Sequence, residues 1–356
     1  MKITFIMFSN ALNGGNRVIG LVASELVARG HDVEIFKLPH KKPRLKAVLR
    51  NYIQHGEGLR KRVDGPFLDR IMDRVTTLET RRPVRDADLP DADVVIATWW
   101  ETAPWVNALS SRKGAKAYFM QDYGAPGQEL DALIPTWKMP FTFITLNRRL
   151  QAMIKAQNLD APVAIMSNAV DHSLFNAPPR VRGMPPTIGL LYRGKQSKGM
   201  DIAAKALTRI RQEIPGVKVV AVGNNKKQLP DWVDLVEKPD DQTLIEIYRS
   251  CDLWLFPSRM EGFGLPIIEA MACRTPVIST RVGGAEDVIT DGVNGCLVDI
   301  DDWNTMATRA IDVLNGPTGD WLKMSQAAHE AVSGHTWSDA VDVFEAALGQ
   351  AAAMRP

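Results

Sequence analysis

Two carboxylates, Glu261 and Glu269, stand at the ends of the segment EGFGLPIIE. Carboxylates accept hydrogen bonds from hydroxyl groups, so one at each end of a short segment can hold the two ends of a hydroxyl-rich ligand. Between them, Gly262 and Gly264 allow the backbone to adopt positive φ and to approach a ligand without an intervening Cβ. These residue types are those of a binding loop.

The flanking sequence predicts a strand before this loop and a helix after it. The apolar run LWLFPS (253–258) has the length of a buried strand, and Pro266 is favoured at the first position of a helix. A helix start directs unpaired amides and the positive end of its dipole back at the loop, which predicts a phosphate site. Glu269 then lies within reach of vicinal hydroxyls such as those of a ribose, and Glu261 lies at the strand end, beyond the phosphates.

Two interpretations of this spacing are open on these residues alone. In one, each carboxylate holds one end of a sugar nucleotide. In the other, the segment is a plain strand-to-helix turn in which Glu269 only complements the helix dipole.

The N-terminal half of the chain alternates apolar runs with amphipathic stretches. KITFIMF (2–8) predicts a strand, residues 17–30 a helix ended by Gly30, and DVEIFKL (32–38) a second strand. Such a βαβ unit implies a parallel sheet. Further strands are predicted at 92–98, 116–122, 141–147 and 163–170. We therefore expect a doubly wound α/β unit.

A proline-rich stretch separates the two halves. Residues 175–186, FNAPPRVRGMPP, carry four prolines without periodicity, which is typical of a hinge linker. After it, strands are predicted at 187–193, 217–223, 253–258, 276–280 and 296–299, and helices at 200–214, 242–251, 265–273 and 305–314. We expect domains at 1–174 and 187–335 that face each other across a cleft. A C-terminal segment, 336–356, follows; its helix begins at a capping Ser338 and is expected to pack back toward the first domain.

The composition is that of a soluble globular enzyme, with 45% hydrophobic and 24% charged residues over 356 positions. Cys251, Cys273 and Cys296 lack CxxC spacing and lie in apolar surroundings, which favours neither disulfides nor zinc and fits a reducing compartment. The opening MKITFIMFSN is too short for a signal peptide or a membrane span, so we expect a cytoplasmic protein. The net charge of +2 gives no reason to expect a nucleic-acid partner.

The binding loop belongs to a longer pattern. Glu261 and Glu269 form an E-x7-E pair within EGFGLPIIEAMACRTPVISTRVGGAEDVITDGVNGCLVD, and an acidic DIDD follows. Over about fifty residues this region resembles the signature region of family 4 glycosyltransferases of the GT-B fold. The resemblance implies two Rossmann-like domains and the retaining transfer of a hexose-type sugar from a nucleotide-diphosphate sugar.

The resemblance assigns donor-side roles to individual residues of the loop. It implies that Glu269 binds the donor ribose and that Glu261 lies near the hydroxyls and anomeric carbon of the transferred sugar. The amides of Phe263, Gly264 and Leu265 would then meet the pyrophosphate and the distal sugar.

Two cations and two glycines complete the donor side that the resemblance implies. In LYRGKQSKGMD the cations are most simply Arg193 and Lys198, with Lys195 a competitor for the second role. Such cations stabilise a nucleoside diphosphate, which gains negative charge as it leaves. Gly14 and Gly15 in LNGGNRV resemble the family's paired-glycine loop beneath the diphosphate, although a tight strand-to-helix turn explains them equally well.

On the acceptor side the sequence departs from the family. Many members have a His after the strand that faces the acceptor, whereas here KAYFM runs into Gln121, Asp122 and Tyr123. Asp122 can bind or deprotonate an acceptor hydroxyl, or it can cap a loop. Trp100, at another strand end, can form a sugar platform or pack in the core.

The resemblance also implies catalysis without a divalent metal, because Arg193 and Lys198 can do a metal's electrostatic work. No nucleophile is evident. We therefore expect front-face attack by the acceptor hydroxyl while the departing phosphate takes the proton, with Glu261 orienting the sugar. No cofactor is expected beyond the donor itself.

Residues 41–85 carry thirteen basic and five acidic side chains with apolar residues interleaved. Such a segment can lie on an anionic membrane, where many enzymes of the family find lipid-linked acceptors, or it can form helices with a solvated basic face. The expected partners are a nucleotide sugar and a glycan, lipid-linked or small-molecule acceptor, as in the synthesis of surface polysaccharides or glycolipids. The membrane alternative places the protein at the inner face of the cytoplasmic membrane.

Two other functions stay open. A sugar-nucleotide epimerase also uses two such domains but is not expected to carry the E-x7-E pair. A non-catalytic nucleotide-sugar-binding protein is not expected to retain Glu261, Arg193, Lys198 and Glu269 together. The sequence does not indicate the base, the sugar, the acceptor or the oligomeric state.

Overall fold

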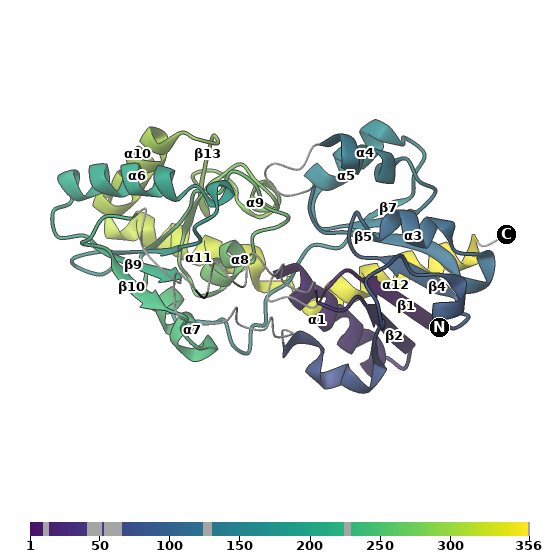
Figure 1. Cartoon of the computed structure of the whole chain (residues 1–356). Helices are drawn as coiled ribbons and strands as arrows, with labels where there is room; N and C mark the ends of the chain where they lie inside the picture. The colour runs from purple at the N-terminus through teal and green to yellow at the C-terminus, as the bar shows by residue number, and fades with distance from the viewer. Residues whose placement is uncertain (10–13, 41–51, 53–65, 124–129, 224–228, 355–356) are drawn as a thin grey trace.

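The computed structural model describes residues 1–9, 14–40, 52, 66–123, 130–223 and 229–354. Within them the chain forms two parallel β-sheets with helices packed around each, and the two units lie side by side (Figure 1). We call the first sheet with its helices the N-terminal lobe and the second the C-terminal lobe. The predicted α/β architecture of two doubly wound sheets is confirmed.

The N-terminal lobe has a seven-stranded sheet in the order β3-β2-β1-β4-β5-β6-β7, paired in parallel throughout. Its strands are β1 (Lys2–Met7), β2 (Asp32–Lys37), β3 (Val75–Thr77), β4 (Val94–Ala97), β5 (Ala115–Met120), β6 (Thr142–Thr145) and β7 (Val163–Ile165). Its α-helices are α1 (Gly14–Ala28), α3 (Ala103–Ala108), α4 (Leu130–Trp137) and α5 (Arg148–Gln157). Every residue of β4 is buried, which is why a central parallel strand forms a continuous apolar run in the sequence.

The C-terminal lobe has a six-stranded parallel sheet in the order β10-β9-β8-β11-β12-β13. Its strands are β8 (Thr187–Leu191), β9 (Lys218–Gly223), β10 (Asp234–Glu237), β11 (Leu253–Phe256), β12 (Val277–Thr280) and β13 (Gly295–Val298). Its α-helices are α6 (Met200–Glu213), α7 (Asp241–Ser250), α8 (Leu265–Ala272), α9 (Ala285–Val288), α10 (Trp303–Asn315) and α11 (Thr318–Ser333). The edge strands β3 and β10 are short and partly exposed, so they lack the apolar pattern that predicted the inner strands.

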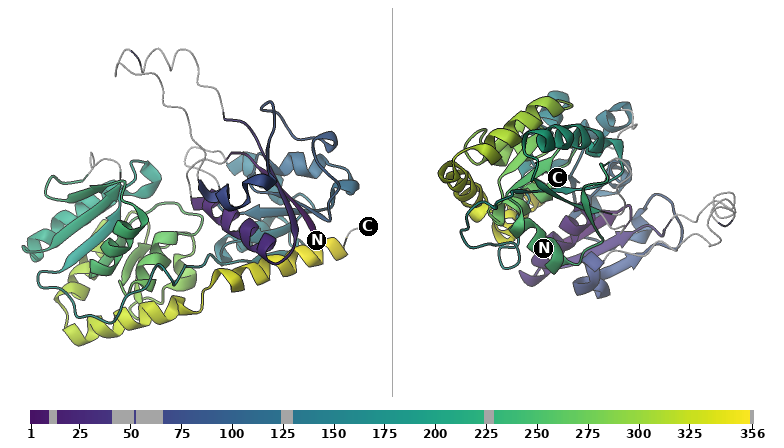
Figure 2. Two further views of the ribbon diagram at one scale, coloured as in Figure 1. Left: turned by 90° about the horizontal axis from the view of Figure 1, so that it is seen from below. Right: turned by 90° about the vertical axis from the view of Figure 1, so that its left-hand side faces the viewer.

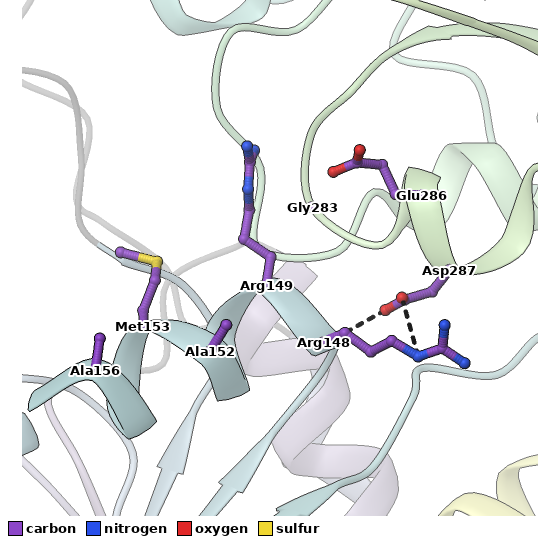
Figure 3. A pocket seen from close by; sticks show the side chains of 8 residues that line it. All are labelled: Arg148, Arg149, Ala152, Met153, Ala156, Gly283, Glu286 and Asp287. Atoms are coloured by element: carbon purple, nitrogen blue, oxygen red, sulfur yellow. Dashed lines mark hydrogen bonds and ion pairs between the residues drawn. The ribbon is translucent and has the colours of Figure 1, made fainter. Parts of the chain in front are cut away.

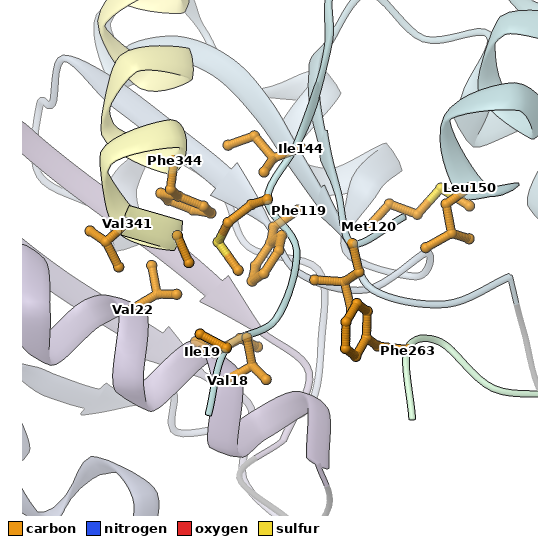
Figure 4. Close-up of a cluster of buried hydrophobic side chains, with 14 of the residues drawn as sticks. Val18, Ile19, Val22, Phe119, Met120, Ile144, Leu150, Phe263, Val341 and Phe344 are labelled. Atoms are coloured by element: carbon orange, nitrogen blue, oxygen red, sulfur yellow. The ribbon is translucent and has the colours of Figure 1, made fainter. Parts of the chain in front are cut away.

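The last helix, α12 (Trp337–Ala353), returns to the N-terminal lobe, as predicted, and packs on α1, β5 and β6. Figure 2 shows it as a long yellow helix that runs along the base of that lobe. Phe344 on its inner face is fully buried and lies 6.1 Å from Phe5 and 5.1 Å from Phe119 between ring centroids. These contacts connect the last helix to the first strand, and Figure 4 shows Phe344 beside Phe119.

The predicted cap of this helix is wrong. Thr336, not Ser338, is the N-cap, and its Oγ1 accepts a hydrogen bond from the amide of Asp339 at 3.1 Å. Ser338 lies inside the first turn, where its hydroxyl and carbonyl oxygens accept hydrogen bonds from Arg29, the residue after α1, at 3.1 and 2.8 Å. Thr336 and Asp339 have the spacing of a capping box, which is the signal that identifies the earlier start.

Candidate active site

The strand order of each sheet reverses at one point, between β1 and β4 in the first sheet and between β8 and β11 in the second. Open parallel sheets bind ligands beyond the carboxyl ends of their strands at such a reversal. The residues predicted from sequence follow these four strands: Gly14 and Gly15 follow β1, Trp100 follows β4, Arg193 and Lys198 follow β8, and Glu261 follows β11. The topology therefore gathers them at two reversal points.

The loops at the carboxyl ends of the two sheets are in direct contact. The Asn147 side-chain amide donates to the carbonyl of Gly262 at 2.5 Å, joining the loop after β6 to the loop after β11. A Cβ at position 262 would lie 2.1 Å from the carbonyl oxygen of Gln121, so only glycine allows this approach. A Cβ at Gly14 would lie 3.8 Å from Leu265, which brings the starts of α1 and α8 together.

The loop from 261 to 265 has free amides at the start of α8. Gly264 is the N-cap, and its φ of +100° requires glycine. In the part of the chain that the structure describes, the amides of Phe263, Gly264 and Leu265 donate to no protein group. The side chain of Phe263 is buried and packs beside Met120 and Leu150 of the N-terminal lobe (Figure 4). The side chain thus anchors the loop while its amides remain available for an anion.

Glu269 is a buried carboxylate with two partners. Its Oε2 accepts a hydrogen bond from the Tyr248 hydroxyl at 3.0 Å, and its Oε1 forms an ion pair with Arg17 of α1 at 3.2 Å. Burial raises the pKa of Glu269 above its ordinary value, and Arg17 opposes that shift. The predicted ribose-binding acid is therefore paired with a cation from the other lobe, which no local sequence pattern signalled.

Glu261 lies in a small polar cluster. Its Oε1 accepts from the Lys198 ammonium group and from the Ser258 hydroxyl, both at 2.7 Å. Its side chain is 13% exposed, so it is reachable but largely shielded. The structure thus brings Glu261 and Lys198 into contact, whereas Arg193 and Lys195 are exposed and form no ion pair with any described residue.

Arg259 is a site residue that no sequence motif pointed to. Its guanidinium forms a two-pronged pair with Asp201 at 2.8 and 2.9 Å, contacts Asp301 at 2.5 Å, and donates to the Gln196 carbonyl at 2.9 Å. Its own amide donates to the Ser197 carbonyl at 2.7 Å. It thereby fastens the segment that carries Lys198 to the segment that carries Glu261.

The comparisons with known proteins identify the C-terminal part of the chain. Residues 175–331 match the family model described as glycosyl transferases group 1. The match lies within the linker and the C-terminal lobe. The match includes Glu261, Glu269, Lys198 and Arg259 of the site described above.

Several curated relatives of this chain share one name. D-inositol 3-phosphate glycosyltransferase of Mycolicibacterium smegmatis is 28% identical over 229 residues, which are 56% of this chain and 50% of that protein. The protein of that name from Mycolicibacterium vanbaalenii is 37% identical over 125 residues, 35% of this chain and 27% of that protein. The chain therefore matches half or less of the length of these relatives.

Solved structures match nearly the whole chain. HepE of Anabaena, in complex with UDP and glucose, has a TM-score of 0.76 at 17% identity, covering 98% of this chain and 100% of that one. Sucrose-phosphate synthase of Thermosynechococcus elongatus has a TM-score of 0.74 at 16% identity, covering 98% and 99%. At such identities the likeness shows the fold, and the GT-B architecture implied by the resemblance is confirmed.

The predicted acceptor residues lie in the N-terminal lobe, across from the C-terminal lobe. Asp122 is half-buried, and its Cβ would be 3.2 Å from a Cβ placed on Gly262. Trp100 is also half-buried and packs against the core, and its indole nitrogen has no hydrogen-bond partner among the described residues. Asp122 thus lies beside the loop that carries Glu261, and the indole N–H of Trp100 donates no hydrogen bond to a described residue.

The described residues contain no cluster of three His, Cys, Asp or Glu side chains suited to a metal ion. No described helix has the length and apolarity to cross a membrane. Cys251, Cys273 and Cys296 are buried free thiols. The site residues described above are carboxylates, cations and backbone amides.

Proposed function

We propose that this protein is a retaining glycosyltransferase that moves a hexose-type sugar from a nucleotide-diphosphate sugar to a hydroxyl acceptor. The observation that carries the proposal is the placement of two carboxylates at one strand-to-helix loop. Glu269 is buried in the second turn of α8, and Glu261 contacts Lys198 from the loop after β11. Between them lie three unpaired amides at a helix start, which favour a diphosphate.

Each part of the donor has a place in this arrangement. Glu269 accepts hydrogen bonds from the ribose hydroxyls, and the amides of Phe263, Gly264 and Leu265 bind the diphosphate together with Arg193 and Lys198. Gly14 and Gly15 form the opposite wall, because the start of α1 touches the start of α8. Since HepE, which shares this fold, was solved in complex with UDP and glucose, UDP is the first nucleotide to test.

The transfer follows a front-face course in this proposal. The bond between the anomeric carbon and the diphosphate oxygen breaks while a bond from the acceptor oxygen to the same carbon forms on the same face. The acceptor proton passes to the departing phosphate. Lys198 and Arg193 stabilise the growing negative charge of the leaving group, so the proposal requires no divalent metal or further cofactor. Glu261 orients the transferred sugar.

The acceptor side is proposed from the residues that face this loop. Asp122 binds or deprotonates the acceptor hydroxyl, and Trp100 offers an aromatic face to a sugar ring. The acceptor is a glycan, a lipid-linked sugar or a small molecule; several curated relatives are named for one phosphorylated polyol, D-inositol 3-phosphate. Residues 41–65 of the basic segment lie, apart from 52, outside the described residues, so contact with the inner face of the cytoplasmic membrane stays a prediction.

The other functions considered from the sequence are less well supported. A sugar-nucleotide epimerase is not favoured, because the matching family model and the named relatives are glycosyltransferases. A non-catalytic binding protein has no need for the contact between Lys198 and Glu261 at the position proposed for the reacting carbon.

Two variants test the proposal. Glu269→Ala should weaken UDP binding, because the ribose hydroxyls lose the carboxylate that accepts their hydrogen bonds. Glu261→Ala should lower kcat by about 10- to 1,000-fold and leave UDP affinity within about threefold, because it acts on the sugar during transfer. Calorimetry with UDP and turnover with a panel of UDP-, GDP-, ADP- and dTDP-sugars measure the two effects. Full transfer activity in both variants would show that the site is assigned wrongly.

A further inference from the structure

A cavity of about 610 Å³ opens between α5 of the N-terminal lobe and the segment 283–287 of the C-terminal lobe (Figure 3). Gly283 connects it to the proposed reaction centre, because a Cβ at that position would lie 3.0 Å from the Cβ of Glu261. The donor residues Glu269, Arg193 and Lys198 do not line this cavity. It is therefore a separate space next to the reacting end of the site.

The lining of the cavity is apolar along one helix face and charged at its rim. Ala152, Met153 and Ala156 recur at the spacing of one face of α5 and form the apolar wall. Arg149 begins the same face, and Glu286 lies across from it in Figure 3. An apolar wall with charges at one end suits a ligand that has both a ring face and a polar group.

The cations of this rim differ in how they are paired. Arg148 is bound to Asp287, whose carboxylate accepts from its amide at 3.0 Å and pairs with its guanidinium at 3.8 Å. Arg149 donates to the carbonyl of Arg281 at 3.1 Å and has no carboxylate partner among the described residues. Arg149 also forms a side-chain hydrogen bond with Tyr123, which leaves part of its guanidinium for an anion. A guanidinium can bind two oxygens of one phosphate or carboxylate.

Tyr123 links Arg149 to the reaction centre. Burial raises the pKa of its hydroxyl, Arg149 lowers it, and Glu261 raises it, so the phenol lies within the electrostatic reach of both side chains. Tyr123 follows Asp122 directly in the chain, which places the cavity, the candidate acceptor residue and Glu261 in one neighbourhood.

We propose that this cavity holds the acceptor and that Arg149 binds an anionic group on it. The acceptor class is then a hydroxyl compound that carries a phosphate or a carboxylate, with its ring face against α5 and its reacting hydroxyl toward Glu261. This inference rests on the proposed function and adds to it the chemical class of the acceptor and the residue that selects it.

The test compares matched pairs of neutral and anionic polyols in the presence of UDP. The pairs are glucose with glucose 6-phosphate, glucose with glucuronate, and inositol with inositol 1-phosphate, and vesicles of phosphatidylcholine with and without phosphatidylinositol form a membrane arm. Calorimetry or vesicle sedimentation measures binding to the whole protein. At least one anionic member should bind about 10- to 100-fold more tightly than its neutral partner. A preference confined to the vesicles would identify the source as a lipid headgroup, and one among soluble pairs would identify a free acceptor.

Two variants connect the preference to Arg149. Arg149→Ala should abolish the tighter binding of the anionic compound. Arg149→Lys should restore part of it, because lysine returns the charge without the two-pronged geometry of a guanidinium. Lys155→Ala is the control, since Lys155 carries the same charge on the same helix but binds the Leu159 carbonyl and does not line the cavity. The proposal is overturned if no anionic member outbinds its neutral partner, or if the preference survives Arg149→Ala. A separate UDP titration distinguishes the two claims, because failure to bind UDP contradicts the proposed function and not the anion preference.

Discussion

At the scale of single residues, the environment of Glu269 determines how the candidate donor site responds to pH. The carboxyl group is 5% exposed, and burial raises its pKa above the ordinary value of 4.5. Arg17 and the Tyr248 hydroxyl oppose the shift because both interact favourably with the ionised form. The charge state of this one group is therefore set by competition between burial and its two partners.

We predict that UDP affinity falls, on acidification, at a higher pH than an ordinary carboxyl group would allow. In the proposed site the ribose hydroxyls donate hydrogen bonds to the ionised carboxylate of Glu269. Because the pKa of Glu269 is raised, this carboxylate becomes protonated at a higher pH than an ordinary carboxylate does. Titrations between about pH 5 and 8 should show the loss in the wild type, while Glu269→Gln should bind weakly with no such component. A wild type and a variant with parallel pH profiles would exclude Glu269 as the titrating group.

The raised pKa of Glu269 also predicts how the stability of the folded protein changes with pH. Because the folded-state pKa is raised, this group favours folding most below its unfolded-state pKa, and that contribution is lost as the pH rises through the folded-state value. Chemical denaturation of Glu269→Gln should lack this pH-dependent component. A stability contribution from this residue that increases with pH would contradict the assignment.

At the scale of elements, the site depends on how two loops of the C-terminal lobe are held together. Lys198 belongs to the short 3₁₀ helix Gln196–Lys198 after β8, and Glu261 belongs to the loop after β11. Arg259 binds the first segment through the carbonyls of Gln196 and Ser197 and through Asp201. The distance between Lys198 and Glu261 is thus maintained by a residue that touches neither.

We predict that Arg259→Ala lowers kcat by about tenfold, because Lys198 loses its fixed position, and that Arg259→Lys restores only part of the rate. In a Lys198→Ala background the Arg259 substitution should add little, since both changes remove the same interaction. Steady-state kinetics of the wild type, Arg259→Ala, Lys198→Ala and the double variant measure the coupling between the two residues. Arg209→Ala is the control, because Arg209 joins α6 to α10 through Asn304 and Thr308 and does not contact the segment Gln196–Lys198. Additive losses would show that Arg259 does not act through Lys198.

At the scale of the whole molecule, the chain crosses between the lobes twice. It leaves the N-terminal lobe after β7 and returns through α12, whose inner face packs on the first sheet. Ion pairs of Arg29 with Asp342 and Glu345 add to this contact at its edge. The N-terminal lobe is therefore completed by the last residues of the chain.

We predict that Phe344→Ala destabilises the N-terminal lobe by about 3–5 kcal/mol, because the ring is fully buried between Phe5 and Phe119 and leaves a cavity when removed. Chemical denaturation followed by tryptophan fluorescence measures the change. Val343→Ala is the control, since this neighbouring side chain is 40% exposed and its loss should cost less than about 0.5 kcal/mol. Equal effects of the two substitutions would contradict the packing of α12 on the sheet.

The inner strands, the helices α1, α6, α7, α8, α10 and α12, and the strand-loop-helix segment around Glu261 can be predicted from the sequence, because they follow from apolar periodicity and from glycine and proline positions that act over a few residues. Only the folded chain shows that Arg17 pairs with Glu269, that Arg259 joins two loops, and that α5 and Gly283 line one cavity. These contacts join residues up to 252 positions apart in the chain. They depend on which strands become neighbours at the two reversal points, and local sequence patterns carry no information about that pairing.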